Sequence, residues 1–194
     1  MSPRGRLLLV GIPLLLAGAL VAAWPRLRPP TAAEEIREIE GAWRALRDAV
    51  LQGDDEAFFL LHSRRARDRA IEGFPAIRAK YLAAIDPEER EAFHRLYHVT
   101  AEEFLRGEPR DLVVRMLPWL SGLRDRAEIL RVSRVKDVRI EPLTLPDGSV
   151  DRRGVVVLDI TAALDPSEAG KVPPNFDPTV VFVREEDGWK RREF

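Results

Sequence analysis

The spacing of apolar residues changes once along this chain of 194 residues, close to Gly122. From residue 31 to that glycine, apolar side chains recur every three or four positions, which is the period of amphipathic helices. After it, runs rich in valine and isoleucine alternate with Pro, Asp and Gly, which is typical of strands joined by tight turns. We therefore predict a single α+β domain at 31–194, with a helical part at 31–122 packed on an antiparallel sheet at 123–194.

The strongest helix signal lies at residues 31–53. Thr31 and Glu34 have the spacing of a capping box at its start, and Gly53 suits its end. Between these signals the apolar residues form one stripe, at Ile36, Ile39, Trp43, Leu46 and Val50. Because the stripe ends after about two heptads, we predict a helix that faces the core rather than a coiled coil.

Shorter helices are predicted from their start and stop signals. Asp86-Pro87 suits a helix N-terminus, and Thr100 with Glu103 repeats the capping-box spacing. Pro118 is predicted to end the last of these helices, because its ring cannot continue a helical turn. The mixed-charge run at 63–73 indicates a solvated helical face.

The C-terminal runs carry strand and hairpin signals. In the run at 154–164 the even-numbered positions from 156 onwards are all apolar, whereas the odd-numbered positions are mixed and include Asp159. This alternation predicts a strand with one buried and one partly exposed face. The Asp-Gly pairs at 146–149 and 186–189 predict hairpin turns. Loops of two and of four residues both fit the last hairpin, and they place Trp189 opposite different partners.

Residues 1–30 are predicted to form a membrane anchor or a signal segment. Leu7–Trp24 carries no charge and is bracketed by arginines. As a helix it would be about 27 Å long, close to the ~30 Å of a bilayer's hydrocarbon core. We predict a single-pass transmembrane helix in a bacterial cell membrane, with the C-terminal domain outside the cytoplasm. The alternative is a signal peptide cleaved near Val21-Ala22-Ala23, which leaves a secreted or periplasmic protein.

The charge balance and the lack of cysteine exclude several function classes. The formal net charge is -1, and residues 31–194 hold 27 of the 31 basic residues and all 32 acidic ones. A nucleic-acid-binding protein normally carries a basic surplus, so we expect no nucleic-acid partner. Without cysteine the chain has no thiol nucleophile, thiolate metal site, disulfide or acylated lipoprotein cysteine.

Three stretches resemble the nuclear-transport-factor-2-like superfamily. They are QGDDEAFFLLHSRRAR at 52–67, GVVVLDITAAL at 154–164 and VVFVREEDGWKRREF at 180–194. The resemblance implies a cone-like fold in which a curved antiparallel sheet packs on helices. The chain looks most like the small exported or membrane-anchored members of unknown activity. Residues 64–120 lie outside the resemblance.

Four residues are candidate cavity or contact residues: His62, Asp159, Phe176 and Trp189. Enzymes of this superfamily place an Asp, His or Tyr inside the cone to move protons, so the resemblance implies such a role for His62 or Asp159. The alternatives are a capping or surface histidine and an exposed, arginine-paired carboxylate. Trp189 is expected to fill the sheet or its open end. Phe176 belongs to a long connection at 165–178. This connection is either a surface loop or a loop that binds a partner or covers a cavity.

A pair of histidines has a spacing that suits metal chelation. His94 and His98 are four residues apart, but Arg95 stands where the zincin motif requires a glutamate. Helical periodicity places Phe93 and Leu96 on one side and both histidines on the other. We predict that the histidines are solvated or cover a neighbouring helix, and we expect no metal, cofactor or catalytic residue.

These observations favour a membrane-tethered extracytoplasmic module that binds a ligand or partner without catalysis. One alternative is an assembly accessory of an envelope complex that uses residues 64–120 as its contact surface. Another is a small-molecule isomerase, dehydratase or hydrolase that uses the cone cavity. The expected partners are the membrane, through the N-terminal helix, and an unknown protein or small molecule. A homodimer formed through the sheet is a further alternative.

Overall fold

The computed structural model describes residues 29–83, 86–145, 147–160 and 178–192. The chain divides into two compact units, residues 1–35 and residues 36–194. The predicted membrane segment at Leu7–Trp24 lies outside the described residues. Within the ranges that are described, no helix is both long and apolar enough to span a bilayer.

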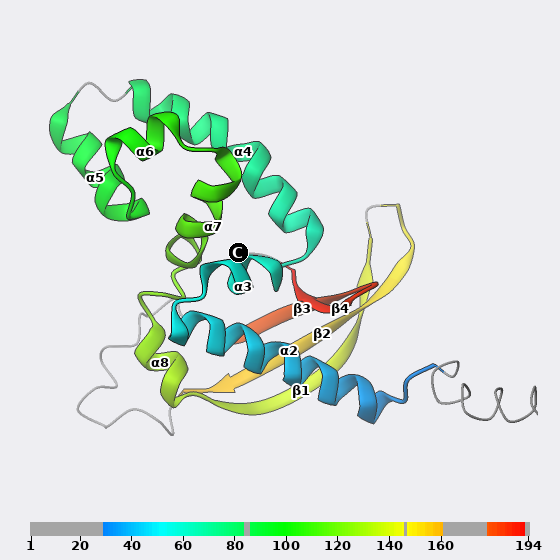
Figure 1. Ribbon diagram of the computed structural model, residues 1–194. Coiled ribbons are helices and arrows are strands. Elements are labelled where there is room, and N and C mark those ends of the chain that lie inside the picture. The colour runs from blue at the N-terminus through cyan, green and yellow to red at the C-terminus, as the bar shows by residue number, and fades with distance from the viewer. Residues whose placement is uncertain (1–28, 84–85, 146, 161–177, 193–194) are drawn as a thin grey trace, which may run out of the picture. The chain divides into compact units, whose positions relative to one another are not determined.

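Helices precede strands along the chain, and the fold is α+β as predicted (Figure 1). The helices are α2 (Ala32–Gln52), α3 (Asp55–Leu60), α4 (Arg64–Ala83), α5 (Pro87–Tyr97), α6 (Ala101–Arg106), α7 (Pro109–Leu120) and α8 (Ala127–Val132). The strands are β1 (Arg134–Thr144), β2 (Val150–Asp159), β3 (Thr179–Glu185) and β4 (Gly188–Arg191).

The start signals predicted from sequence are confirmed. The hydroxyl of Thr31 accepts from the amide of Glu34 at 3.3 Å, and the Glu34 carboxylate accepts from the amide of Thr31 at 2.8 Å. Thr100 and Glu103 form the same reciprocal capping box at α6. Asp86 caps α5, with Pro87 in the first turn. These contacts satisfy backbone donors that the first turn of a helix leaves without intrahelical partners.

Two features of the helical part differ from the predictions. α7 continues through Pro118, because a proline removes only one backbone bond and this helix ends two residues later, at Leu120. Residues 127–132 form α8 rather than a strand, so the sheet begins at Arg134 and not at 123. The valine and isoleucine content of 127–138 does not separate a short helix from a strand.

The apolar stripe of α2 is buried as predicted. Ile39, Trp43, Leu46 and Val50 are each at most 1% exposed. They belong to one core cluster with Phe58 of α3 and with side chains of the sheet. α2 therefore owes its place to the burial of this stripe as well as to its cap.

Helices α4 to α7 extend the helical part away from the sheet (Figure 1). α4 leads away from the sheet, α5 and α6 lie near its far end, and α7 returns. Their contact is aromatic, with the Tyr81 ring 4.7 Å from that of Phe104 and 5.8 Å from that of Phe93. The Arg78 guanidinium stabilises the connection between α6 and α7. It donates to the carbonyls of Phe104 (2.9 Å) and Gly107 (2.6 Å).

The described strands form one open antiparallel sheet in the order β1-β2-β3-β4. The predicted hairpin turn at 146–149 joins β1 to β2, with Gly148 at a φ of 82°. The last hairpin has a two-residue loop, since Glu185 pairs with Gly188. Trp189 therefore lies opposite Arg184, which settles the register that the sequence left open.

One face of the sheet packs on α2. A Cβ on Gly154 would lie 2.7 Å from the Cδ1 of Ile39, so the α2 side chain rests directly on the strand backbone. Val156 and Leu158, on the same side of β2 as this glycine, are buried. The even-numbered face of the strand is thus the core face, as the alternation predicted, and Asp159 belongs to the other face.

Candidate functional site

A groove of about 450 Å³ lies where the first turns of α4 approach the sheet. Its α4 side is formed by Ser63, Arg65, Ala66 and Arg69, and its sheet side by Leu143, Thr144, Leu145, Asp151, Val183, Arg184 and Glu185, with Arg192 after β4. We call this feature the arginine groove, after Arg65, Arg69, Arg184 and Arg192. Its volume lies in the range of ordinary ligand pockets.

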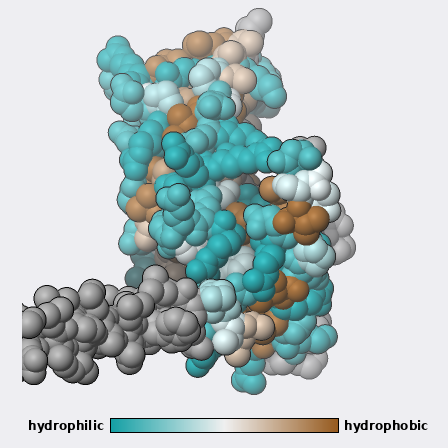
Figure 2. Space-filling model, turned by 90° about the vertical axis from the view of Figure 1, so that its right-hand side faces the viewer, coloured by the Kyte–Doolittle hydropathy of each residue, from teal (hydrophilic) through white to brown (hydrophobic). Residues whose placement is uncertain are grey.

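The start of α4 and the tip of the β1–β2 hairpin lie on the right-hand side of Figure 1. Figure 2 views the molecule from that side. Hydrophilic side chains cover most of this face, and hydrophobic ones appear in separate patches. This face of the molecule is therefore mostly polar.

Backbone contacts between the α3–α4 connection and β4 position the groove. The amide of Arg191 donates to the carbonyl of Leu61, and the amide of Ser63 donates to the carbonyl of Arg191, both at 2.8 Å. The amide of Arg64 donates to the Glu185 carboxylate at 2.7 Å. These bonds join residues more than 120 positions apart, so the groove exists only in the folded chain.

The arginines of the groove differ in their partners. Arg184 forms an ion pair with Glu38 of α2, and its guanidinium lies 5.6 Å from the centre of the Trp189 ring. Arg65 and Arg69 are exposed and form no ion pair or hydrogen bond through their side chains with other described residues. They are one helical turn apart and both face the groove. The groove thus presents two guanidinium groups that form no ion pair within the described part of the chain.

A second hollow of about 640 Å³ adjoins the groove along α4. It is lined by Arg64, Arg65, Asp68, Arg69, Glu72 and Glu185. Because both hollows include Arg65, Arg69 and Glu185, these residues lie at their common boundary. The site is therefore elongated along the first half of α4.

His62 lies in the core beside the groove and does not line it. It is 0% exposed, so the surface alternative raised by the sequence is wrong. Its Nδ1 donates to the carbonyl of Phe58 at 2.8 Å. Burial, and then the positive charges of Arg191 and Arg67, lower the pKa of His62 from 6.5 to about 3, although the bond to Phe58 acts in the opposite direction. The ring is neutral at physiological pH.

The other sequence candidates do not gather at the groove. Asp159 ends β2 opposite Arg134 and is half-buried. Trp189 is buried at 4% exposure on the core face of β4. Phe176 and most of the loop at 165–178 lie outside the described residues. Of these candidates, Asp159 and Trp189 are therefore not part of the groove lining.

His94 covers the neighbouring helix α4, which is one of the two predicted placements, but the predicted faces of α5 are wrong. His94 is half-buried, whereas Leu96, expected on the buried side, is 56% exposed. The Nδ1 of His94 donates to the carbonyl of Val99 at 3.0 Å, and its Nε2 faces the Tyr81 hydroxyl at 3.3 Å. These bonds satisfy both ring nitrogens, which allows a polar ring on the inner face of a short helix.

His98 occupies a different environment. It ends α5 with a φ of 53°, and its ring stacks on that of Trp119 at 3.5 Å between centroids. The part of the chain that the structure describes contains no group of three or more His, Asp or Glu side chains arranged to hold a metal. Both histidines have roles in packing helices together.

We expect His94→Ala to lower the free energy of unfolding by about 1–2 kcal/mol, because it leaves the Val99 carbonyl without its donor. His98→Asn, which suits the left-handed backbone, should change it by less than about 1 kcal/mol. Urea unfolding followed by tryptophan fluorescence measures both. Equal and small effects would mean that His94 is as solvated as the sequence indicated.

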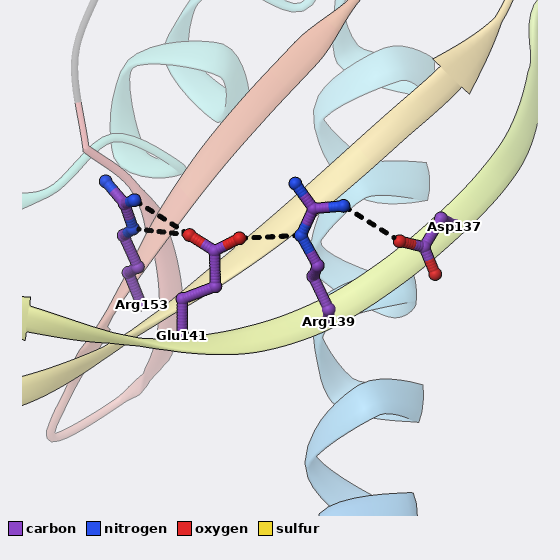
Figure 3. Close-up of polar contacts among 4 residues, drawn as sticks. All are labelled: Asp137, Arg139, Glu141 and Arg153. Carbon is purple, nitrogen blue, oxygen red and sulfur yellow. Dashed lines mark hydrogen bonds and ion pairs between the residues drawn. The ribbon is translucent and has the colours of Figure 1, made fainter.

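Charged side chains on the other face of the sheet are internally paired (Figure 3). Arg139 of β1 contacts Asp137 at 3.2 Å and Glu141 at 2.6 Å, and Arg153 of β2 contacts Glu141 at 2.7 Å. Hydrogen bonds from Arg139, and then from Arg153, lower the pKa of Glu141. These arginines are paired, whereas Arg65 and Arg69 form no ion pair with another residue that the structure describes.

The groove was not predicted from the sequence. The mixed-charge run at 63–73 indicated a solvated helical face, and Arg65 and Arg69 are indeed exposed. One local signal was present, since α4 has no acidic residue in its first turn, where negative charge is favoured. That signal does not reveal that the sheet supplies the opposite wall.

No family model matches this chain. Comparison with curated proteins and with solved structures also gave no match.

Proposed function

We propose that the protein is a binding module that recognises a ligand or partner through the arginine groove. The observation that carries this proposal is the pair Arg65 and Arg69, which line a groove of ligand size and form no side-chain ion pair or hydrogen bond with other described residues. A charged side chain without an internal partner is available to an external one. Arg184, in contrast, is already paired with Glu38.

Binding without catalysis is the function that suits these side chains. Arginine stays protonated at all physiological pH values, so it holds an anion but does not exchange protons. His62, a buried titratable residue next to Ser63 of the groove lining, is neutral and does not line the groove. The described lining combines four arginines with the carboxylates of Asp151 and Glu185, and these groups supply charge and hydrogen bonds for binding.

We propose further that Leu7–Trp24 tethers this module to the cell membrane, with residues 31–194 outside the cytoplasm. The support is the uncharged segment and its flanking arginines. A cone-like sheet of the nuclear-transport-factor-2-like kind belongs to the same proposal, and the helix-before-sheet order supports it. Cell fractionation tests the tether, since the full chain should sediment with membranes and a chain lacking residues 1–30 should not.

Site-specific photocrosslinking in cells tests the binding function. A benzophenone side chain at Thr144, which lines the groove, should give a discrete adduct that Arg65→Glu abolishes. The matched position is Leu96 on α5, which is exposed but lies outside the groove. An adduct at Leu96 alone would favour the assembly accessory that uses residues 64–120. Adducts at neither position would contradict the proposal.

A further inference from the structure

We propose that the arginine groove binds an extended acidic segment of a partner protein, with the carboxylates of its residues i and i+2 held by Arg65 and Arg69. This inference rests on the proposed function, because it names the partner chemistry of the same groove.

The two arginines define the charge and the geometry of the ligand. Each guanidinium presents a planar fork of donors that matches a carboxylate in a bidentate arrangement. Neither Arg65 nor Arg69 forms an ion pair with a carboxylate among the residues that the structure describes. The groove therefore has two open positions for carboxylates on its α4 wall.

The distance between these positions fits a peptide in extended conformation. Residues four apart on a helix have Cβ atoms about 5–6 Å from each other. In an extended segment, residues i and i+2 face the same side and are about 6.6 Å apart. Alternate acidic residues of an extended segment therefore match Arg65 and Arg69, whereas adjacent acidic residues would point in opposite directions.

The remaining lining suits a peptide better than a small anion. The hollow continues along α4 from the groove towards Glu72, which gives room for the uncharged residues that flank the two acidic ones. Leu143 and Val183 are apolar parts of the sheet side. The side chains between two acidic residues would face that wall, so the segment should alternate acidic and apolar residues.

The carboxylates of the site fix the orientation of the segment. Glu185 is engaged by the amide of Arg64 at 2.7 Å, and Asp151 by that of Arg152 at 2.8 Å. Asp151 lies on the sheet side, where it repels an acidic ligand and directs its carboxylates towards Arg65 and Arg69, whereas Glu185 contacts the start of α4. Asp68 and Glu72 line only the second hollow, and Asp68 lies 3.8 Å from Arg64.

Fluorescence anisotropy with the full chain in detergent micelles tests this proposal. The labelled probe is Gly-Ser-Glu-Val-Glu-Val-Ser-Gly. The controls are the same peptide with both glutamates replaced by glutamine, and one with the two glutamates adjacent. We expect the alternating acidic peptide to bind at least about tenfold tighter than the glutamine peptide, and high salt to weaken it.

Matched variants assign the effect to the groove. Arg65→Gln with Arg69→Gln should weaken the acidic peptide at least about tenfold, and the paired Lys variant should weaken it less because it keeps the charge. Arg95→Gln with Arg106→Gln removes two exposed helical arginines outside the groove and should leave affinity unchanged. Circular dichroism confirms that each variant is folded.

Three results would overturn the acidic-segment proposal. They are equal binding of the acidic and glutamine peptides, equal binding by the Arg65/Arg69 variant, and displacement of the peptide by an equal concentration of inorganic phosphate. If Thr144 still gives an adduct that depends on Arg65, only the peptide chemistry is wrong. If the adduct is also absent, the proposed function fails with it.

Discussion

Trp43→Ala lowers the free energy of unfolding by about 3–5 kcal/mol, the usual cost of removing a core aromatic side chain. Trp43 is 1% exposed in the middle of the α2 stripe, and it belongs to the cluster that joins α2, α3 and the sheet. Its loss removes a large apolar surface and leaves a cavity that well-packed neighbours fill only in part. Urea unfolding of the variant and the parent chain gives the difference.

The control for this change is Leu96→Ala on α5. Leu96 is 56% exposed, so its replacement should cost less than about 0.5 kcal/mol. A loss below about 1 kcal/mol for Trp43→Ala would contradict the burial of the α2 stripe.

His62 makes stability depend on pH. Its pKa is about 3 in the folded chain and 6.5 when the chain is unfolded, so between these values the unfolded chain binds more protons. The free energy of unfolding should therefore fall by about 1.4 kcal/mol for each pH unit below 6.5, until pH approaches 3. The contribution is fully present above 6.5.

The His62→Gln variant isolates this effect. Glutamine does not titrate and can still donate to the carbonyl of Phe58. Below pH 6.5 the stability of the parent chain should fall more steeply than that of the variant, as measured by urea unfolding at successive pH values. Parallel pH profiles would mean that His62 is solvated in the folded protein.

The arginines on the sheet and those on the α4 side of the groove differ in their ion pairing. Arg139 and Arg153 lie in a ladder with Asp137 and Glu141, which joins β1 to β2. Arg65 and Arg69 have no comparable ladder among the described side chains. Exposed ion pairs contribute little to stability. The ion pairs are informative here because they show which guanidinium groups already contact a carboxylate within the protein.

The sequence by itself determined the local elements of this protein. The capping boxes of Thr31 and Thr100, the α2 stripe and the Asp-Gly hairpins depend on contacts within a few residues. Such contacts follow from side-chain type and spacing, so a pattern of residues predicts them. The helix-before-strand order, and with it the α+β class, follows from the same signals.

Only the tertiary structure decided the features that depend on distant residues. The face that α5 buries is set by Tyr81 and Val99, which give His94 its partners in place of solvent. His62 is neutral because the folded chain buries it near Arg191. The arginine groove needs α4 beside strands more than 70 residues later in the chain. Burial and charge pairing act between residues that folding brings together, and local spacing does not encode which residues those are.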